Sequence, residues 1–239
     1  PQPPADFVHG PEGLGDLPAP DVARTADPRD GAHYLVESCA AAPGEIVICA
    51  VGPLTNLATA LALDTDITRT AARVVVMGGS AARHGNVSDC AEANIWNDPH
   101  AADAVFAADW DVIMVGLDVT EKTQCTPDDF AAIAGQSPII GGFLRDATAF
   151  YFDFHQAKTG NRICFMHDPS ALMAVTSPEL FGFEATPISV VCEGEDIGRT
   201  VTGAEGRRPV QVAMTVDSAA ARRHFIQTTG RADAAAAGR

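Results

Sequence analysis

The chain has 239 residues, 46% of them hydrophobic, which is enough for the core of one large domain or two small ones. Its 31 acidic and 16 basic residues give a net charge of −15, and a field of that sign repels nucleic-acid phosphates and anionic membranes. No apolar run reaches the roughly 18 residues that a membrane-spanning helix requires. We therefore expect neither a nucleic-acid partner nor a membrane-embedded protein.

The six cysteines are scattered along the chain and form no CxxC pair, which argues against a zinc or thioredoxin-type site. Cys49 falls in an apolar segment and Cys39 on one face of an expected helix, positions typical of buried free thiols. Because free thiols persist in a reducing compartment, we expect a cytoplasmic protein.

The first half of the chain alternates between helical and strand patterns. Residues 1–20 are rich in Pro and Gly and are expected to form a loop. Residues 27–42 predict a helix, with Asp27 as its cap and Pro28 in its first position. Residues 45–51 form a continuous apolar run, typical of a strand covered on both faces, and a helix is expected to follow.

A long polar segment follows the next apolar run, at residues 73–77. It carries Asn86, Glu92 and Asn94, and a helical pattern resumes at Pro99. A loop of this length inside a compact domain is usually functional or disordered. Amides donate and accept hydrogen bonds and carboxylates accept them, so these side chains suit a hydroxyl-rich ligand. The alternative interpretation is a solvated surface loop.

The second half repeats the alternation and then changes. A strand is expected at 111–116, followed by two helices over 127–158 that break near residue 137. Residues 187–193 and 209–216 predict strands, 218–227 a last helix, and 230–239 a disordered tail. The predicted fold is a single α/β domain over 1–239, with a mostly parallel Rossmann-like sheet flanked by helices and a β-hairpin appendage.

Five segments, in this order along the chain, resemble motifs of the inosine-uridine-preferring nucleoside hydrolases. They are residues 8–16, 52–56, 77–94, 116–120 and 167–169. The resemblance implies hydrolysis of the N-glycosidic bond of a ribonucleoside, a small-molecule nucleoside as the partner, calcium (Ca²⁺) as the cofactor and a role in base salvage. A homo-oligomer is compatible with it.

The resemblance also assigns roles to residues. It implies that the ribose is held by Met77, Asn86, Glu92 and Asn94. Asp168 and the carbonyl of Val51 would bind calcium, and the catalytic histidines would be His9 and His167, the latter near the leaving base. Without the resemblance, His167 and Asp168 would be interpreted as a helix-capping pair. His155 is a further candidate for contact with the base.

One family motif has no counterpart. An aspartate-rich N-terminal strand supplies most calcium ligands and the general base in the family, and no such motif precedes His9. We expect a fragment that lacks this strand rather than a degenerate homologue, because the downstream motifs are intact. As given, the chain is then expected to be inactive. Two other function classes remain: a non-catalytic ribose- or nucleoside-binding homologue, and an acidic structural or partner-binding domain.

Overall fold

The computed structural model describes residues 5–19, 25–82 and 84–238. The chain divides into two compact units. The first unit, here called the sheet unit, comprises residues 26–121 and 167–216. The second, the helical unit, comprises residues 1–25, 122–166 and 217–239.

The sheet unit is built on a six-stranded sheet with the strand order β1-β2-β3-β8-β6-β7. Its strands are β1 (Val47–Ala50), β2 (Arg73–Met77), β3 (Val112–Val115), β6 (Phe181–Val190), β7 (Thr200–Thr202) and β8 (Pro209–Val216). The pairs β1–β2, β2–β3 and β3–β8 are parallel, whereas β6 is antiparallel to both β8 and β7. The predicted mostly parallel α/β fold is confirmed.

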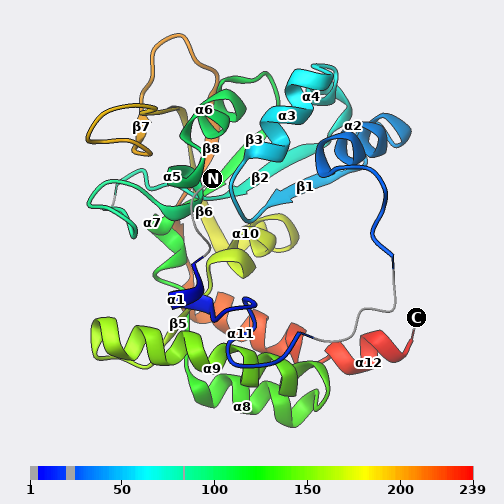
Figure 1. Cartoon of the computed structure of the whole chain (residues 1–239), viewed down its shortest axis with the longest axis vertical. Coiled ribbons are helices and arrows are strands. Elements are labelled where there is room, and N and C mark those ends of the chain that lie inside the picture. The colour runs from blue at the N-terminus through cyan, green and yellow to red at the C-terminus, as the bar shows by residue number, and fades with distance from the viewer. Residues whose placement is uncertain (1–4, 20–24, 83, 239) are drawn as a thin grey trace. The chain divides into compact units, whose positions relative to one another are not determined.

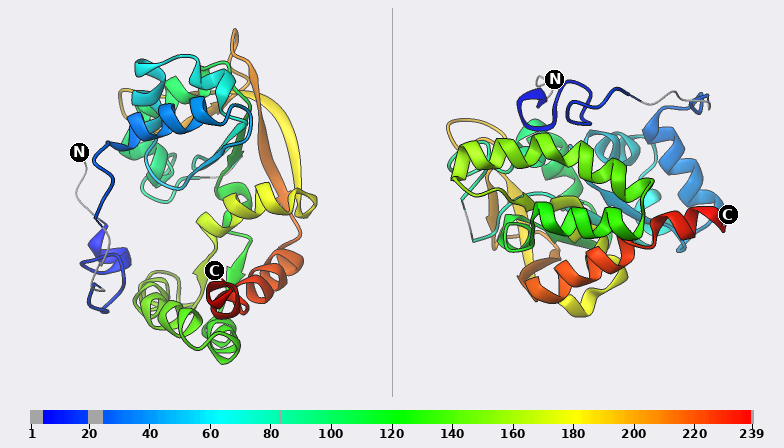
Figure 2. Two further views of the ribbon diagram at one scale, coloured as in Figure 1. Left: turned by 90° about the vertical axis from the view of Figure 1, so that its right-hand side faces the viewer. Right: turned by 90° about the horizontal axis from the view of Figure 1, so that it is seen from below.

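The helices of the sheet unit cover both faces of this sheet. They are α2 (Gly31–Ala41), α3 (Thr55–Leu63), α4 (Ile67–Thr70), α5 (Ala93–Asn97), α6 (Pro99–Ala107), α7 (Leu117–Thr120), α10 (His167–Thr176) and the 3₁₀ turn η1 (Pro178–Leu180). Helices α2, α3 and α6 lie on one face of the sheet (Figure 1), and their buried side chains share a core with Val74 and Val76 of β2. Helix α10 packs against β2 and β3 on the other face (Figure 2). Side chains alternate between the faces of a strand, which explains why β2 is apolar throughout.

The predicted hairpin belongs to the main sheet. Strand β8 pairs with β3 on one side and with β6 on the other, so the β6–β8 pair extends the sheet rather than standing beside it. Strand β6 starts at Phe181, before the predicted start at residue 187. A short strand, β7, lies between the two predicted strands of the hairpin, where a loop was expected. The isolated pattern of β7 is too short to be recognised from sequence.

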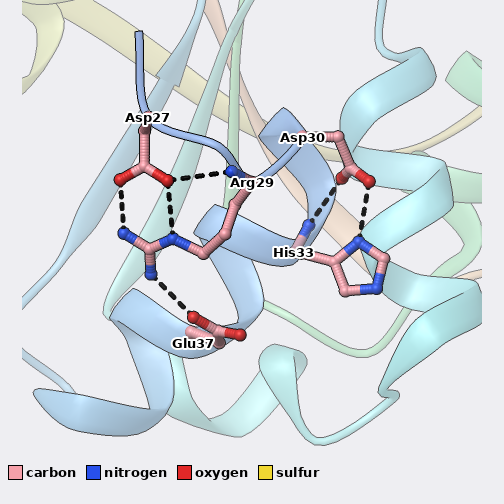
Figure 3. A network of polar contacts seen from close by, with 5 residues as sticks. All are labelled: Asp27, Arg29, Asp30, His33 and Glu37. Carbon is pink, nitrogen blue, oxygen red and sulfur yellow. Dashed lines mark hydrogen bonds and ion pairs between the residues drawn. The ribbon is translucent and has the colours of Figure 1, made fainter. Parts of the chain in front are cut away.

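Helix α2 begins later than predicted. Its cap is Asp30, whose carboxylate accepts a 3.0 Å hydrogen bond from the backbone N–H of His33 (Figure 3). Asp27 instead accepts hydrogen bonds from the backbone and guanidinium of Arg29, which also reaches Glu37. Asp27 is therefore part of a surface ion-pair network that precedes the helix.

The helical unit contains a paired α-helical hairpin and shorter elements. These are α1 (Asp6–His9), β4 (Gln124–Cys125), α8 (Pro127–Gln136), α9 (Ile140–Thr159), β5 (Cys164–Phe165), α11 (Ser218–Thr229) and α12 (Ala232–Ala237). Helices α8 and α9 lie side by side (Figure 2) and are separated near residue 137, as predicted. Phe130 and Phe152 form the centre of the core with Cys125, Cys164 and Met166. Helix α1 lies in the segment that was predicted to be loop only.

The predicted disordered tail contains helix α12. The carboxylate of Asp233 accepts hydrogen bonds of 2.8 Å from the backbone N–H groups of Ile139 and Ile140, at the start of α9. Alanine has the highest helix propensity, so the Ala-rich sequence forms a helix once this distant contact holds one end. Low complexity predicts disorder for this segment, whereas the structure has a helix at Ala232–Ala237.

Asp129 provides a stability prediction for the helical unit. Its carboxylate closes the cap of α8 through Thr126 and forms a bidentate pair with Arg222 of α11, at 2.8 and 2.9 Å. We expect Asp129→Ala to lower the free energy of unfolding by about 2 kcal/mol in chemical denaturation. The matched variant Asp128→Ala, in the exposed position next to it, should change it by no more than about 0.5 kcal/mol.

The Asp129–Arg222 pair also makes the stability difference between the wild type and Asp129→Ala depend on pH. Burial alone would raise the pKa of Asp129, but hydrogen bonds from Arg222 and Thr126 outweigh burial and lower it. A lowered folded-state pKa stabilises the protein above the unfolded value of about 3.9, and this contribution disappears as the pH falls through the folded-state pKa. The difference between wild type and Asp129→Ala should therefore shrink below about pH 4. A difference that grows in acid would contradict this assignment.

Candidate functional site at the carboxyl end of strand β2

The loop after β2 is shaped by two glycines. Gly79 has a φ of 78°, in the left-handed region, and a Cβ there would lie 2.9 Å from side-chain atoms of Met114 and Thr200. A Cβ on Gly85 would lie 2.1 Å from the carbonyl oxygen of Ala91. Only glycine fits these positions, so the loop folds back closely on itself and presents residues 86–94 beside the end of the strand.

Glu92 is the buried centre of this loop. Only 2% of the residue is exposed, and Oε2 accepts hydrogen bonds from the backbone N–H groups of Gly79, Asn94 and Ile95 at 3.0, 3.0 and 3.2 Å. The carboxylate thereby caps α5 and ties it to the glycine turn. Desolvation raises the pKa of Glu92 most, the three N–H bonds counteract it, and the charge of Asp168 raises it further.

Asn94 and Asn86 are held in the same hydrogen-bonded cluster. The amide nitrogen of Asn94 donates to the carbonyl oxygen of Met77 at 3.0 Å and lies 3.3 Å from its sulfur. Asn86 Oδ1 accepts a 3.0 Å hydrogen bond from the backbone N–H of Ala93. Each side chain is fixed through one polar atom. Within the described residues, Glu92 Oε1, Asn94 Oδ1 and Asn86 Nδ2 have no hydrogen-bond partner.

The two residues at the start of α10 lie in the same unit. His167 Nδ1 is 2.8 Å from the hydroxyl oxygen of Thr120, which ends α7. Asp168 is exposed, but nearby protein atoms still desolvate its carboxyl group, which raises its pKa. Its charge acts on Cys49, whose pKa is raised mainly by desolvation and also by Asp168. Val51 follows β1 at its carboxyl end and is 46% exposed.

The structure therefore brings most of the predicted residues to one edge of the sheet. In an open α/β sheet, ligands bind beyond the carboxyl ends of the strands, and β1, β2 and β3 all end there. Met77, Glu92 and Asn94 are linked directly by hydrogen bonds, and Asp168 is linked electrostatically. Nothing in the described residues gathers three or more His, Cys, Asp or Glu side chains into a metal-binding group.

His9 and His155 belong to the helical unit. The His9 ring stacks on Tyr151, with 5.4 Å between ring centroids, and partial desolvation lowers its pKa although the residue is exposed. His155 is 6% exposed and surrounded by the rings of Tyr151, Phe154 and Phe165. Neither nitrogen of His155 has a hydrogen-bond partner within the described part of the chain, and burial lowers its pKa most.

Three polar residues near the site make hydrogen bonds that stabilise local structure. Asp118 is buried and accepts 2.8 Å hydrogen bonds from the backbone N–H groups of Ala81 and Ala82. Asp98 caps α6 through the N–H of Ala101, at 3.0 Å. Asn97 is exposed and donates to the carbonyl of Ala93 within α5, at 2.8 Å.

Sequence patterns missed the hairpin residues that brace the loop. Thr200 Oγ1 accepts from the N–H of Ser80 at 2.9 Å and donates to its carbonyl at 2.6 Å, across 120 residues of sequence. An isolated bridge joins Ala91 to Arg199. A recess of about 440 Å³ is lined by Ser80, Ala81, Ala82, Asp89, Cys90, Arg199 and Thr200. None of the predicted ribose-binding residues lines it, so we assign the site from the hydrogen-bonded chemistry instead of from this recess.

No helix in the described part of the chain is both long and apolar enough to cross a membrane.

Comparison with known proteins identifies the family. The family model described as inosine-uridine preferring nucleoside hydrolase matches residues 1–223. Uridine nucleosidase 1 of Arabidopsis thaliana is 35% identical over 224 residues, which are 89% of this chain and 67% of that protein. The inosine-uridine preferring nucleoside hydrolase of Crithidia fasciculata is 30% identical over 220 residues, covering 89% of this chain and 70% of that protein.

Solved structures agree in fold. A plant nucleoside hydrolase matches with a TM-score of 0.91 and 30% identity, covering 96% of this chain and 75% of that one. A purine-preferring ribonucleoside hydrolase from Gardnerella vaginalis matches with a TM-score of 0.89 and 32% identity, covering 94% and 73%. Together with the motifs at the end of β2, these matches show that the chain belongs to the inosine-uridine preferring nucleoside hydrolase family.

Proposed function

We propose that the protein hydrolyses the N-glycosidic bond of ribonucleosides, releasing ribose and a free base. The observation that carries this proposal is the hydrogen-bonded cluster of Glu92, Asn94 and Met77 at the carboxyl end of β2. The Glu92 carboxylate and the Asn94 amide are each held in place by hydrogen bonds to backbone groups. Their second polar atoms, with that of Asn86, match a ligand rich in hydroxyl groups.

The ribose-binding role follows from the transition state. Breaking the glycosidic bond develops oxocarbenium character on the sugar ring. Hydrogen bonds from the ribose hydroxyls to Glu92 Oε1 and Asn94 Oδ1 strengthen as that charge develops. Because these acceptors are already fixed, no reorganisation is needed when the bond breaks. Met77 would pack beside the sugar.

His167 is proposed as the general acid. The carbon–nitrogen bond breaks with its electron pair passing to the base, and the base takes a proton from the imidazolium of His167. Water adds to the sugar carbon and passes its proton to a general base, which the resemblance places on the family's aspartate motif. The resemblance assigns His9 to the active site and makes His155 a candidate for contact with the base. Both assignments stay predictions.

We propose calcium as the cofactor because the charge on the Asp168 carboxylate is uncompensated among the residues that the structure describes. Its carboxylate has no hydrogen-bond or ion-pair partner within the described residues, and its charge disfavours ionisation of both Glu92 and Cys49. A cation beside Asp168 would relieve that repulsion, and carboxylate and carbonyl oxygens are the donors that calcium prefers. Asp168 and the carbonyl of Val51 would hold the ion, which would supply Lewis acidity for activating water.

We also propose a cellular location and a metabolic role. All six cysteines are free thiols, which accords with a reducing, cytoplasmic compartment. Release of a base from a nucleoside accords with salvage of purines or pyrimidines.

The experiment is product analysis with inosine and uridine, using protein that carries the family's aspartate motif upstream. We expect equimolar base and ribose with calcium present, and strong suppression by a calcium chelator. Nucleoside binding without ribose release would select the non-catalytic alternative. Absence of any nucleoside affinity would select a structural or partner-binding domain.

A further inference from the structure

Thr120 has a buried hydroxyl group with a single hydrogen-bond partner in the described part of the chain. The residue ends α7, and 0% of it is exposed. Its backbone N–H donates to the carbonyl of Gly116 at 3.2 Å, as in an ordinary helical turn. Within the described residues, its hydroxyl has one hydrogen-bond partner, His167 Nδ1, at 2.8 Å. The contact joins positions 47 residues apart, so it is created by the fold and not by local sequence.

A buried hydroxyl with one partner constrains that partner. A threonine hydroxyl can donate one hydrogen bond and accept others, and buried polar groups are almost always paired. When the imidazole is neutral, Thr120 can donate to Nδ1 with the ring proton on Nε2, or accept from Nδ1–H with Nε2 bare, which is the form that remains after Nε2–H has given its proton away. When both ring nitrogens carry protons, Nδ1–H can donate to the same hydroxyl oxygen. Thr120 therefore occupies Nδ1 in either form of the ring.

We propose that Thr120 is a positioning residue that makes Nε2 of His167 the nitrogen that exchanges a proton with the leaving base. This inference rests on the proposed function of His167 as general acid. The hydrogen bond fixes the plane of the imidazole and prevents rotation of Nδ1 toward the substrate. Second partners of this kind commonly set which ring nitrogen of a histidine is reactive. Valine at position 120 keeps the volume but has no hydroxyl, whereas serine keeps the hydroxyl.

The activity test compares two leaving groups in the catalytically competent protein. A purine leaves readily only when protonated, whereas the nitrophenolate of 4-nitrophenyl riboside leaves without a proton. Thr120→Val should lower kcat for inosine about 10- to 100-fold, less than the roughly 10²- to 10⁴-fold of complete general-acid catalysis because His167 itself remains, and leave 4-nitrophenyl riboside hydrolysis within about twofold. Thr120→Ser should restore most of the inosine rate. His167→Ala serves as the reference and should show the same split with a larger loss.

The outcomes separate this inference from the proposed function. Equal losses on both substrates for Thr120→Val would mean a merely structural role and would overturn the inference. An unchanged Thr120→Val enzyme beside a split in His167→Ala would overturn the inference and leave the general acid in place. No split in His167→Ala would overturn both.

A second readout needs no activity. Nitrogen-15 NMR of residues 1–239 at about pH 8.5, where an ordinary imidazole is neutral, reports which ring nitrogen of His167 carries the proton. We expect one neutral tautomer to predominate in the wild-type chain and in Thr120→Ser, because the hydroxyl engages Nδ1, and a mixture of both tautomers in Thr120→Val. A wild-type ring that already averages between the two tautomers, or a Thr120→Val ring with the same tautomer distribution as the wild type, would overturn the inference even if the enzyme is active.

Discussion

Replacing Asn94 by alanine in the catalytically competent enzyme is expected to lower kcat/KM for inosine and uridine by about two orders of magnitude, a loss of about 2–4 kcal/mol in transition-state stabilisation. The amide nitrogen of Asn94 is fixed by the carbonyl and sulfur of Met77, at 3.0 and 3.3 Å. Its oxygen is therefore oriented before the substrate binds, and the loss should appear mainly in kcat. Steady-state kinetics at saturating and limiting nucleoside measure the division between kcat and KM.

Asn97 provides the matched control on the same short helix. It is exposed, and its amide donates to the carbonyl of Ala93 within α5, at 2.8 Å. Asn97→Ala removes the same chemical group from the same helix and should leave both kinetic constants close to those of the wild type. Similar losses in the two variants would mean that α5 matters through its stability and that Asn94 does not hold the ribose.

Calcium binding by residues 1–239 alone is expected to be weak, with a Kd on the order of 1 mM or higher. The assigned ligands are the carboxylate of Asp168 and the carbonyl of Val51. Calcium takes six to eight oxygen ligands and gains affinity from each carboxylate, so water would have to complete most of the shell. None of the assigned residues accepts a proton from the attacking water, so we also expect no nucleoside hydrolysis by these residues alone.

A protein that carries the family's aspartate motif upstream of these residues should show both tight calcium binding and nucleoside hydrolysis. Calorimetric titration with calcium and ribose release from inosine, each with and without the added segment, measure them separately. Asp168→Asn in the extended protein should weaken calcium binding while leaving the melting temperature in the absence of calcium unchanged or higher, because it removes a desolvated charge. Hydrolysis by residues 1–239 alone would contradict this account and would direct attention to Glu12, Asp16 and Asp89 as bases.

The central strands could be predicted from the sequence because both of their faces are buried, which makes each strand a continuous apolar run. Residues 73–77 were expected as a strand and form β2 with those limits, and residues 112–115 of the second predicted run form β3. A parallel strand covered on both faces must be apolar at every position, so its pattern is continuous. Caps were less certain, since the cap of α2 is Asp30 and not the predicted Asp27.

The short helices could not be predicted because distant contacts define them. Helix α5 has only five residues and begins at Glu92, whose carboxylate also reaches Gly79 across 13 positions. Helix α12 depends on the contact between Asp233 and the start of α9, 94 residues away. Isolated helices of this length are marginal in water, so no local pattern could reveal them.

The site, too, has features that the sequence predicts and features that depend on distant contacts. The residue types at Asn86, Glu92 and Asn94 suggested a hydroxyl-rich ligand, and the family resemblance supplied their roles. Their hydrogen bonds to the backbone, which use one polar atom of each side chain, depend on how the loop folds back. The contact between Thr120 and His167 has no sequence signal at all, because it joins two segments that meet only in the folded sheet unit.

The most direct test of the ribose site is NMR titration of the competent protein with inosine in the presence of calcium, following the backbone amide signals and the side-chain amide signals of asparagine. The account predicts that the amides of Asn86 and Asn94 shift with nucleoside concentration, because both side chains would contact the sugar. The amides of Asn97 and Asn161, which bond only within their own segments or are exposed, should not move. Shifts confined to residues around Arg199 and Cys90, with Asn86 and Asn94 unchanged, would contradict the placement of the ribose beside β2.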